Sequence, residues 1–196
     1  MAAKRAITPD DIIPIDVYAI DRKERRKALV GVKRHRRVDV GPVCTFYFEN
    51  FVTMLSQVQE MLYIEKGGDA QLKDEMEAYN PLIPQGCELV ATVMFEIDEP
   101  VRRATFLAKL GGVEETAFFQ FDGQTVMGTP EEDVDRTTAA GKASAVQFIH
   151  FHFTPEQVAR FRAENAQIIL GFRHESYSHM TVLPEAVRAA LAQDFD

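Results

Sequence analysis

A two-residue turn, Asp122-Gly123, is the sequence feature that most restricts the fold of this chain. It joins two short runs rich in aromatic and β-branched residues, 116–121 and 124–127. An Asp-Gly pair between such runs is typical of a β-hairpin, because both residues tolerate the positive φ angles of a tight turn. The sequence therefore predicts a pair of antiparallel strands here.

Four other segments have the composition of strands: 38–48, 89–97, 145–153 and 167–173. Segment 89–97 is apolar on both faces, which is typical of a central strand. Apolar spacing and capping residues, such as Asn50 before residue 51, predict helices over 16–36, 51–66, 69–79, 101–110, 155–165 and 184–192. The Gly- and Pro-containing stretch 128–142 is predicted to be a mobile loop.

This order of elements predicts a single α+β domain over residues 1–196. Its sheet should be mixed or mainly antiparallel, with about six strands and helices packed on it. We expect a basic helical arm over residues 1–37 and the α+β core over residues 38–196.

The composition is that of a globular protein, with 46% hydrophobic and 27% charged residues. The sequence contains no apolar run of the roughly 18 residues that a membrane span needs. The N-terminus lacks the apolar core of a signal peptide. We therefore expect a cytoplasmic protein with no membrane partner, in which Cys44 and Cys87 are free thiols.

The charges are distributed unevenly. Residues 1–37 hold 11 of the 22 Lys and Arg residues and five acids, which gives +6, and the remainder carries −14. The basic block over 22–37 is interpreted as a solvent-exposed helix face that also packs on the acidic remainder. Nucleic-acid binding is disfavoured, because the block has no interleaved aromatic residues and the whole chain is acidic.

Three predicted strands place polar or titratable side chains on one face, since side chains two residues apart point the same way. These faces carry Thr45, Tyr47 and Glu49, then Thr92, Met94 and Glu96, and finally Phe148, His150 and His152. If the faces meet, with Gln57 and Glu60 of the next helix over them, they form a polar pocket. Asn50, Gln57 and Thr92 would then contact a ligand.

His150, His152 and Glu96 are the candidate metal ligands. Two imidazoles at positions i and i+2, with a carboxylate from a neighbouring element, suit zinc, manganese or iron, which accept nitrogen and oxygen ligands together. The same groups could act as general acid and base if burial shifts their pKa values. They could also form structural hydrogen bonds, and the sequence leaves these interpretations open.

A second polar cluster, 174–179, follows the last predicted strand, where functional groups often lie on loops. Turn formation is the alternative explanation. The candidate catalytic residues are therefore Glu49, Glu60, Glu96, His174 and Tyr177. The chain has neither a G-x-S-x-G motif nor a glycine-rich phosphate-binding motif, so neither a serine hydrolase nor a nucleotide cofactor is expected.

A series of short motifs runs from residue 7 to the C-terminus. They are Arg36-Arg37-Val38, Gly41-Pro42, Phe48-Glu49-Asn50, Gln57-Val58-Gln59-Glu60-Met61-Leu62, Glu65, Ala78-Tyr79-Asn80-Pro81-Leu82-Ile83-Pro84 and Ala91-Thr92. In these motifs the chain resembles a bacterial family known as domain-of-unknown-function family 3501. His174 and Tyr177 are similar to its His-Pro-x-Tyr element, with Glu175 in place of the proline.

The resemblance supplies no catalytic residue, because the family has no established activity. Its members are often encoded beside a rubrerythrin-like di-iron protein and an iron–sulfur oxidoreductase. The resemblance therefore implies a role in cytoplasmic redox chemistry or peroxide defence.

The charge distribution, the candidate residues and the resemblance together suggest two candidate functions. The first is an accessory or binding partner, without bound metal, in a redox, iron–sulfur or peroxide-defence system; the uneven charge suits electrostatic docking. Its partner would be a rubrerythrin-like or iron–sulfur protein, and two copies could also pair as a homodimer. The alternative is a metal- or small-ligand-binding enzyme that uses the Glu/His pocket, with a divalent metal as cofactor.

Overall fold

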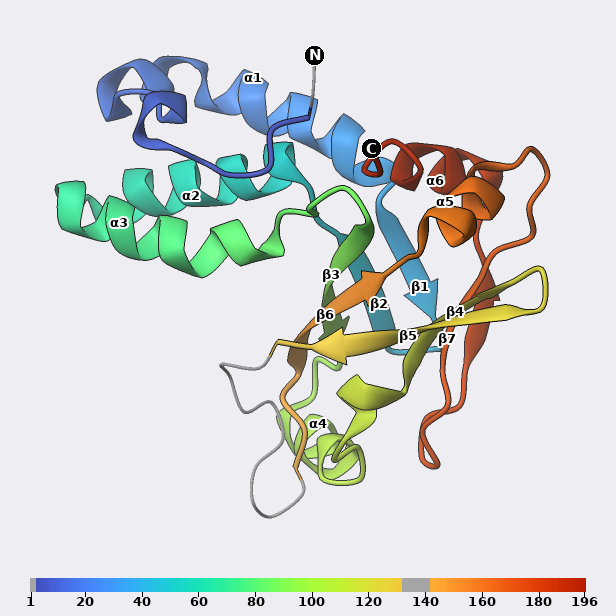
Figure 1. Cartoon of the computed structure of the whole chain (residues 1–196). Coiled ribbons are helices and arrows are strands. Elements are labelled where there is room, and N and C mark those ends of the chain that lie inside the picture. Colours follow the sequence, from blue (N-terminus) through green and yellow to red (C-terminus); the bar gives the residue numbers. More distant parts are fainter. Residues whose placement is uncertain (1–2, 132–141) are drawn as a thin grey trace.

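In the described part of the chain, the fold is built on an eight-stranded sheet in which all neighbouring strands are antiparallel (Figure 1). The computed structural model describes residues 3–131 and 142–196. Across the sheet the order is β1 (Arg37–Val40), β2 (Cys44–Phe48), β3 (Glu88–Phe95), β6 (Val146–His152), β5 (Gln124–Pro130), β4 (Ala117–Phe121), β7 (Ile169–Phe172) and β8 (Met180–Val182).

The sheet curls until its two outer strands, β1 and β8, come into contact. At this seam the hydroxyl of Tyr177 donates a 2.7 Å hydrogen bond to the carbonyl of Val40. The enclosed side is packed with aromatic rings: Phe46, Phe48, Phe95, Phe119, Phe151 and Phe172. Because these rings fill the inside of the near-barrel, the outer face and the rims are where a ligand can reach the sheet.

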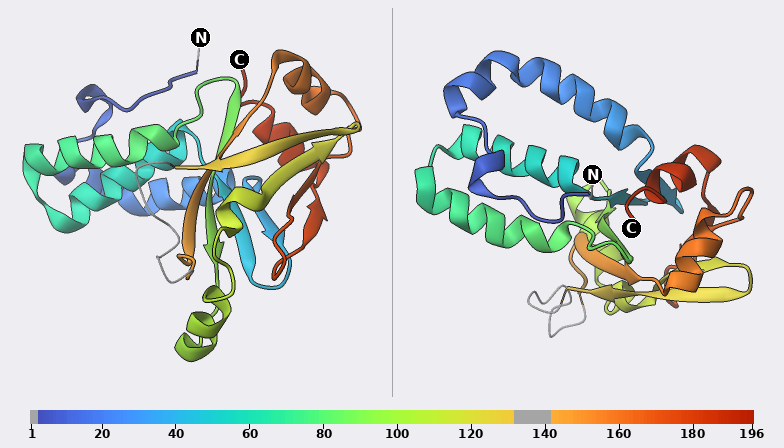
Figure 2. Two further views of the ribbon diagram at one scale, coloured as in Figure 1. Left: turned by 60° about the horizontal axis from the view of Figure 1, so that its bottom comes forward. Right: turned by 45° about the horizontal axis from the view of Figure 1, so that its top comes forward.

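Three helices form a layer outside the sheet: α1 (Ile15–Arg34), α2 (Phe51–Glu65) and α3 (Gly68–Tyr79), with α2 in contact with both α1 and α3 (Figure 2). A second hydrophobic core forms where Met54 and Val58 of α2 pack with Val90 of β3. The side chain of Asn50 accepts a 3.0 Å hydrogen bond from the backbone N–H of Thr53, which confirms the predicted start of α2.

The remaining helices are short: α4 (Pro100–Leu107), α5 (Pro155–Arg162) and α6 (Glu185–Leu191), with 3-10 turns at η1 (Pro9–Asp11), η2 (Asn80–Leu82) and η3 (Val113–Thr116). None of the helices in the described residues has both the length and the apolar content that a membrane span needs. Cys44 is buried, Cys87 is exposed, and both are free.

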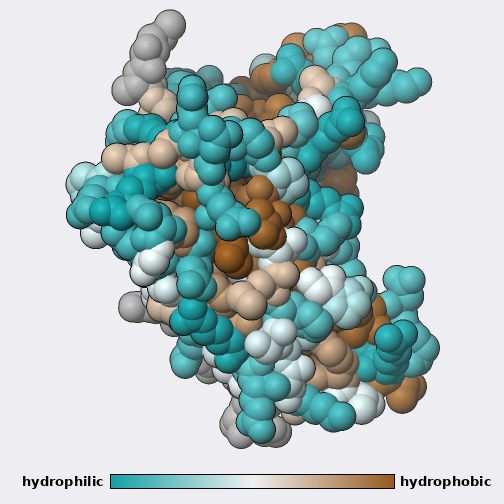
Figure 3. All heavy atoms as spheres, turned by 90° about the vertical axis from the view of Figure 1, so that its right-hand side faces the viewer, coloured by the Kyte–Doolittle hydropathy of each residue, from teal (hydrophilic) through white to brown (hydrophobic). Residues whose placement is uncertain are grey.

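The outer face of β4, β5, β7 and β8 carries a row of apolar residues. Phe118 of β4 lies opposite both Met127 of β5 and Gly171 of β7, and Gly171 lies opposite Met180 of β8. The guanidinium of Arg173 lies 4.1 Å from the centre of the Phe118 ring. Phe118 is therefore fully buried although it points away from the barrel interior. On the side of the molecule seen in Figure 3, hydrophobic residues reach the surface among hydrophilic ones.

The predicted α+β class is confirmed, but the sheet has eight strands rather than about six. The run 38–48, expected as one strand, is divided into β1 and β2 because Gly41 takes a φ of 73° in the turn between them. Prediction misses β8 because three residues are too few to show an alternating pattern. Of the loop predicted over 128–142, residues 132–141 lie outside the described residues.

Candidate metal centre

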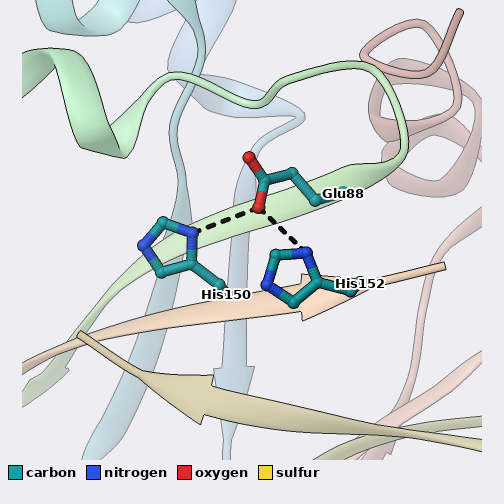
Figure 4. A group of neighbouring side chains, drawn as sticks. All are labelled: Glu88, His150 and His152. Carbon is teal, nitrogen blue, oxygen red and sulfur yellow. Dashed lines mark hydrogen bonds and ion pairs between the residues drawn. The ribbon is translucent and has the colours of Figure 1, made fainter. Parts of the chain in front are cut away.

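One carboxylate and two imidazoles meet at one end of the β3–β6 pair. In the antiparallel register Glu88 lies opposite His152, and Val90 lies opposite His150. Because alternate residues of a strand point to the same face, all three polar side chains project from the outer face of the sheet. Figure 4 shows them turned toward one another.

The acid holds both imidazoles through a single oxygen. Oε2 of Glu88 lies 3.2 Å from Nδ1 of His150 and 3.3 Å from Nδ1 of His152. Oε1 of Glu88 accepts a 3.0 Å hydrogen bond from the backbone N–H of Gln85, which orients the carboxylate. Side-chain exposure rises from 8% for Glu88 through 16% for His150 to 66% for His152. The cluster is therefore anchored on a buried acid and open to solvent at His152.

The pKa of Glu88 lies below its ordinary value. Burial alone would raise this pKa, but the hydrogen bonds with His150 and with the Gln85 N–H lower it. The positive charge that His150 and His152 can carry acts in the same direction, and together these effects outweigh burial. Glu88 is thus ionised at neutral pH, which is the form that binds a cation.

The spacing of the three side chains matches a metal centre. One potential ligand atom from each lies within 4.8 Å of the others. Two atoms bound roughly 2.0–2.1 Å from a tetrahedral zinc ion lie about 3.3 Å apart. The distances from Glu88 Oε2 to the two Nδ1 atoms are 3.2 and 3.3 Å. The same geometry also permits two imidazole N–H groups to donate to one oxygen, and metal titration separates the two cases.

His150 and His152 lie together, but the carboxylate beside them is Glu88 rather than the expected Glu96. Both acids are at even positions along the β3 segment and so project to the same face. The register places Glu88 against His152, whereas Met94 already lies opposite Val146, the first residue of β6. Glu96 therefore lies at the other end of the strand. Prediction misses Glu88 because the expected strand starts at residue 89 and the register is unknown from the sequence.

Glu96 belongs to a separate network that is partly exposed. Its Oε2 accepts a 2.6 Å hydrogen bond from the Thr45 hydroxyl, and its Oε1 accepts a 3.2 Å bond from the Tyr47 hydroxyl. Arg37 lies 4.0 Å from the same carboxylate. These contacts join the outer faces of β1 and β2 to the end of β3.

Glu49 is buried and fastens α2 to the sheet. Its carboxylate accepts a 2.6 Å hydrogen bond from the Thr53 hydroxyl and a 2.8 Å bond from the Thr92 hydroxyl. Two of the expected ligand-binding residues are thus engaged locally, Thr92 with Glu49 and Asn50 as the cap of α2. The third, Gln57, is half-buried on α2.

Glu60 fastens α2 to α1. It accepts a 2.6 Å hydrogen bond from the Tyr18 hydroxyl, and its carboxylate forms a 2.8 Å ion pair with Arg22. The hydrogen bond with Arg22 is the main reason that the pKa of Glu60 lies below its ordinary value. These contacts give Glu60 a structural role, which is to join α2 to α1.

His174 and Tyr177 lie at the other end of the molecule, near the seam. His174 Nε2 lies 3.1 Å from the carbonyl of Gly111, and its Nδ1 accepts a hydrogen bond from the backbone N–H of Ser176. The Tyr177 ring packs edge-on against Phe95, and burial raises the pKa of its hydroxyl to about 12. The predicted acids and imidazoles therefore lie in several separate networks rather than in one pocket.

Comparison with known proteins supports the resemblance seen in the motifs. The sequence matches the family described as Protein of unknown function (DUF3501) over residues 6–195. The chain belongs to the DUF3501 family. Its structure is similar to the crystal structure of a novel protein of unknown function from Burkholderia pseudomallei, with a TM-score of 0.90. The two sequences are 32% identical, and the match covers 97% of this chain and 100% of that chain. A search of curated proteins found no match. The DUF3501 fold thus extends over nearly the whole chain.

Proposed function

We propose that this DUF3501 protein binds a divalent transition metal ion through Glu88, His150 and His152. The convergence of both imidazoles on one carboxylate oxygen is the observation that supports this proposal. A set of two histidines and one carboxylate suits iron(II), manganese and zinc. Three protein ligands leave coordination positions for water, as in catalytic rather than closed structural zinc sites.

The scaffold around the ligands supports the same proposal. All three residues belong to β3 and β6, neighbouring strands within the sheet, and sites on such elements hold their geometry better than sites on loops. The Gln85 N–H orients the Glu88 carboxylate, and groups that orient a ligand in this way strengthen metal binding. The exposed imidazole of His152 gives an ion a path from solvent.

Calorimetric titration of chelator-treated protein with zinc, manganese and, without oxygen, iron(II) tests the proposal. We expect one ion per chain. Cobalt(II) should bind at the same site and give visible absorption bands. Glu88→Gln should weaken binding about 100-fold or more, since loss of even an orienting partner costs roughly 10–100-fold.

Two variants serve as controls. Glu96→Gln removes the other acid on the same strand face, and His179→Ala removes an imidazole that packs on Tyr177 instead. Both should bind metal as the unmodified protein does. The proposal fails if the unmodified protein binds no ion, or if Glu88→Gln binds as tightly as Glu96→Gln.

An accessory role in a redox or iron–sulfur system is the second candidate function. It is supported by the exposure of the basic residues of α1: Lys23, Arg25, Arg26, Lys27, Lys33 and Arg34. A cationic helix on an acidic protein suits docking to an acidic surface. In this role the protein would work in the cytoplasm.

The partner in that role would be a rubrerythrin-like or iron–sulfur protein, and a second copy of the chain is the other candidate. Pull-down and sedimentation at low and high salt test both. Complexes that weaken with salt and with a Lys23→Glu/Lys27→Glu variant would support docking through α1. Absence of any salt-sensitive complex would count against it.

A further inference from the structure

A groove of about 230 Å³ opens between α1 and α2, on elements that carry none of the three proposed metal ligands. Its apolar walls are formed chiefly by Ile13, Leu29, Val32, Val52 and Leu55. An apolar cavity of about 150 Å³ holds a benzene-sized molecule, so this groove accommodates a ring or chain of about eight carbon atoms.

The groove exists because α1 is fastened to the rest of the protein near its two ends. Toward its N-terminus, Tyr18 and Arg22 bind Glu60 of α2. Just after its C-terminus, Arg36 donates to the carbonyls of Phe48 and Glu49 and pairs with the buried Asp194.

Between these two anchors, the apolar residues of α1 are only partly covered. Tyr18 is the residue of this helix that is buried, whereas Leu29 and Val32 remain half-buried on the side that lines the groove. Val52 faces them from α2 and is 48% exposed. The middle of α1 therefore stands over an apolar surface that it does not fully cover.

Arg25 supplies a positive charge at the groove. Its ion pair is with Asp21, one helical turn earlier, at 3.7 Å, and both side chains are about half exposed. An exposed pair of this kind contributes little, so the Arg25 guanidinium is available to a ligand. Among the other polar residues of the lining, Asp11 pairs with Lys4, the Tyr18 hydroxyl donates to Glu60, and the Gln59 amide binds the backbone N–H and carbonyl of Ile13.

We propose that this groove binds a small amphipathic carboxylic acid. Its apolar body would lie between α1 and α2, and its carboxylate would pair with Arg25. Ligand sites of this type combine a predominantly apolar lining with a few placed polar groups. The proposal is independent of the metal site, so either can fail without the other.

Titration of the protein with octanoate, followed through the ¹³C-labelled methyl groups of its Ile, Leu and Val residues, tests this proposal. The methyl groups of the groove residues should shift and saturate, whereas those of Ile20 and Val30, exposed elsewhere on α1, should not. Val52→Trp should abolish saturable binding by filling the groove. Val30→Trp, which adds the same ring outside the lining, should leave it intact.

The charge requirement is tested with 1-octanol. Arg25→Gln should weaken octanoate binding up to about fivefold, which is the range of an exposed ion pair, and leave 1-octanol unaffected. Lys27→Gln, on the same helix but outside the lining, is the matched control. The proposal is overturned if the shifts do not saturate, if Ile20 and Val30 respond equally, or if Val52→Trp binds octanoate like the unmodified protein. If the methyl signals of the groove residues shift with protein concentration rather than with octanoate, the groove binds a second copy of the chain. That result would also overturn the proposal.

Discussion

Glu88 and His152 occupy directly opposed positions on β3 and β6, with Oε2 of the acid 3.3 Å from Nδ1 of the imidazole. In a sheet, the register of two strands determines which side chains can meet, and a shift by one residue would send Glu88 to the other face. The candidate metal centre is therefore a property of strand pairing, and its geometry depends on the stability of the sheet.

Low pH should destabilise the fold in part because Glu88 becomes protonated. Its folded-state pKa lies below its ordinary value of 4.5, so the carboxylate contributes stability above that pH. This contribution is lost as the pH falls through the folded-state pKa. Urea unfolding between pH 7 and pH 3 should therefore show a smaller pH-dependent loss of stability for Glu88→Gln than for the unmodified protein. The exposed substitution Glu24→Gln should leave the full pH dependence in place.

Metal should stabilise the protein reversibly. An ion at 100 times its dissociation constant raises the free energy of unfolding by about 2.7 kcal/mol if it binds only the folded state. We expect this increase with zinc in urea unfolding, and we expect a chelator to reverse it. His152→Asn should remove the increase; an equal gain in this variant would place the ion elsewhere.

Two glycine substitutions should change stability in opposite directions. Gly31 lies within α1 and an added Cβ meets nothing within 4 Å, so Gly31→Ala should gain about 0.5–1 kcal/mol. Gly41 has a φ of 73°, and an added Cβ would lie 2.6 Å from the Tyr177 hydroxyl oxygen. Gly41→Ala should therefore lose about 2 kcal/mol or more in thermal or urea unfolding. If the two substitutions changed the free energy of unfolding equally, the described turn between β1 and β2 would be contradicted.

Tyr177→Phe should cost about 0.5–1.5 kcal/mol, because it removes the buried hydrogen bond to the Val40 carbonyl. The ring contacts with Phe95 and Phe106 should remain. Tyr79→Phe, which removes the hydroxyl of a half-buried side chain on α3 and keeps its ring, is the control and should change the free energy of unfolding by less than about 0.5 kcal/mol.

The buried pair of Arg36 and Asp194 should be strongly coupled. Both side chains are less than a tenth exposed, at 6% and 8%. Loss of one partner leaves a buried charge and should cost about 3–5 kcal/mol. A double-mutant cycle with Arg36→Met and Asp194→Leu should show a coupling energy of at least about 1 kcal/mol in urea unfolding. Strict additivity would mean that the two side chains do not interact.

Local signals in the sequence predict much of the fold. The Asp122-Gly123 turn joins β4 to β5, and Thr154 caps α5 through a hydrogen bond from the Gln157 N–H. These features depend on residues close together in the chain, and their physical causes can therefore be identified without coordinates. β8 has no comparable signal, because it becomes a strand only by pairing with β7.

The candidate site is less predictable, because it depends on contacts between distant segments. The i, i+2 spacing brings His150 and His152 to one face, but the choice between Glu88 and Glu96 depends on the β3–β6 register. Arg36 illustrates the same limit. It belongs to a basic run that is expected to be exposed, yet it is buried because Asp194, 158 residues later, lies beside it.

The seam between β1 and β8 has a consequence for the behaviour of this protein in concentrated solution. An open sheet of this size would present two free edges, and unpaired edge groups can recruit strands from other molecules and start aggregation. Here the two outer strands face each other, and the Tyr177 hydroxyl caps a Val40 carbonyl between them. The curvature of the sheet thus shields its own borders from intermolecular strand addition.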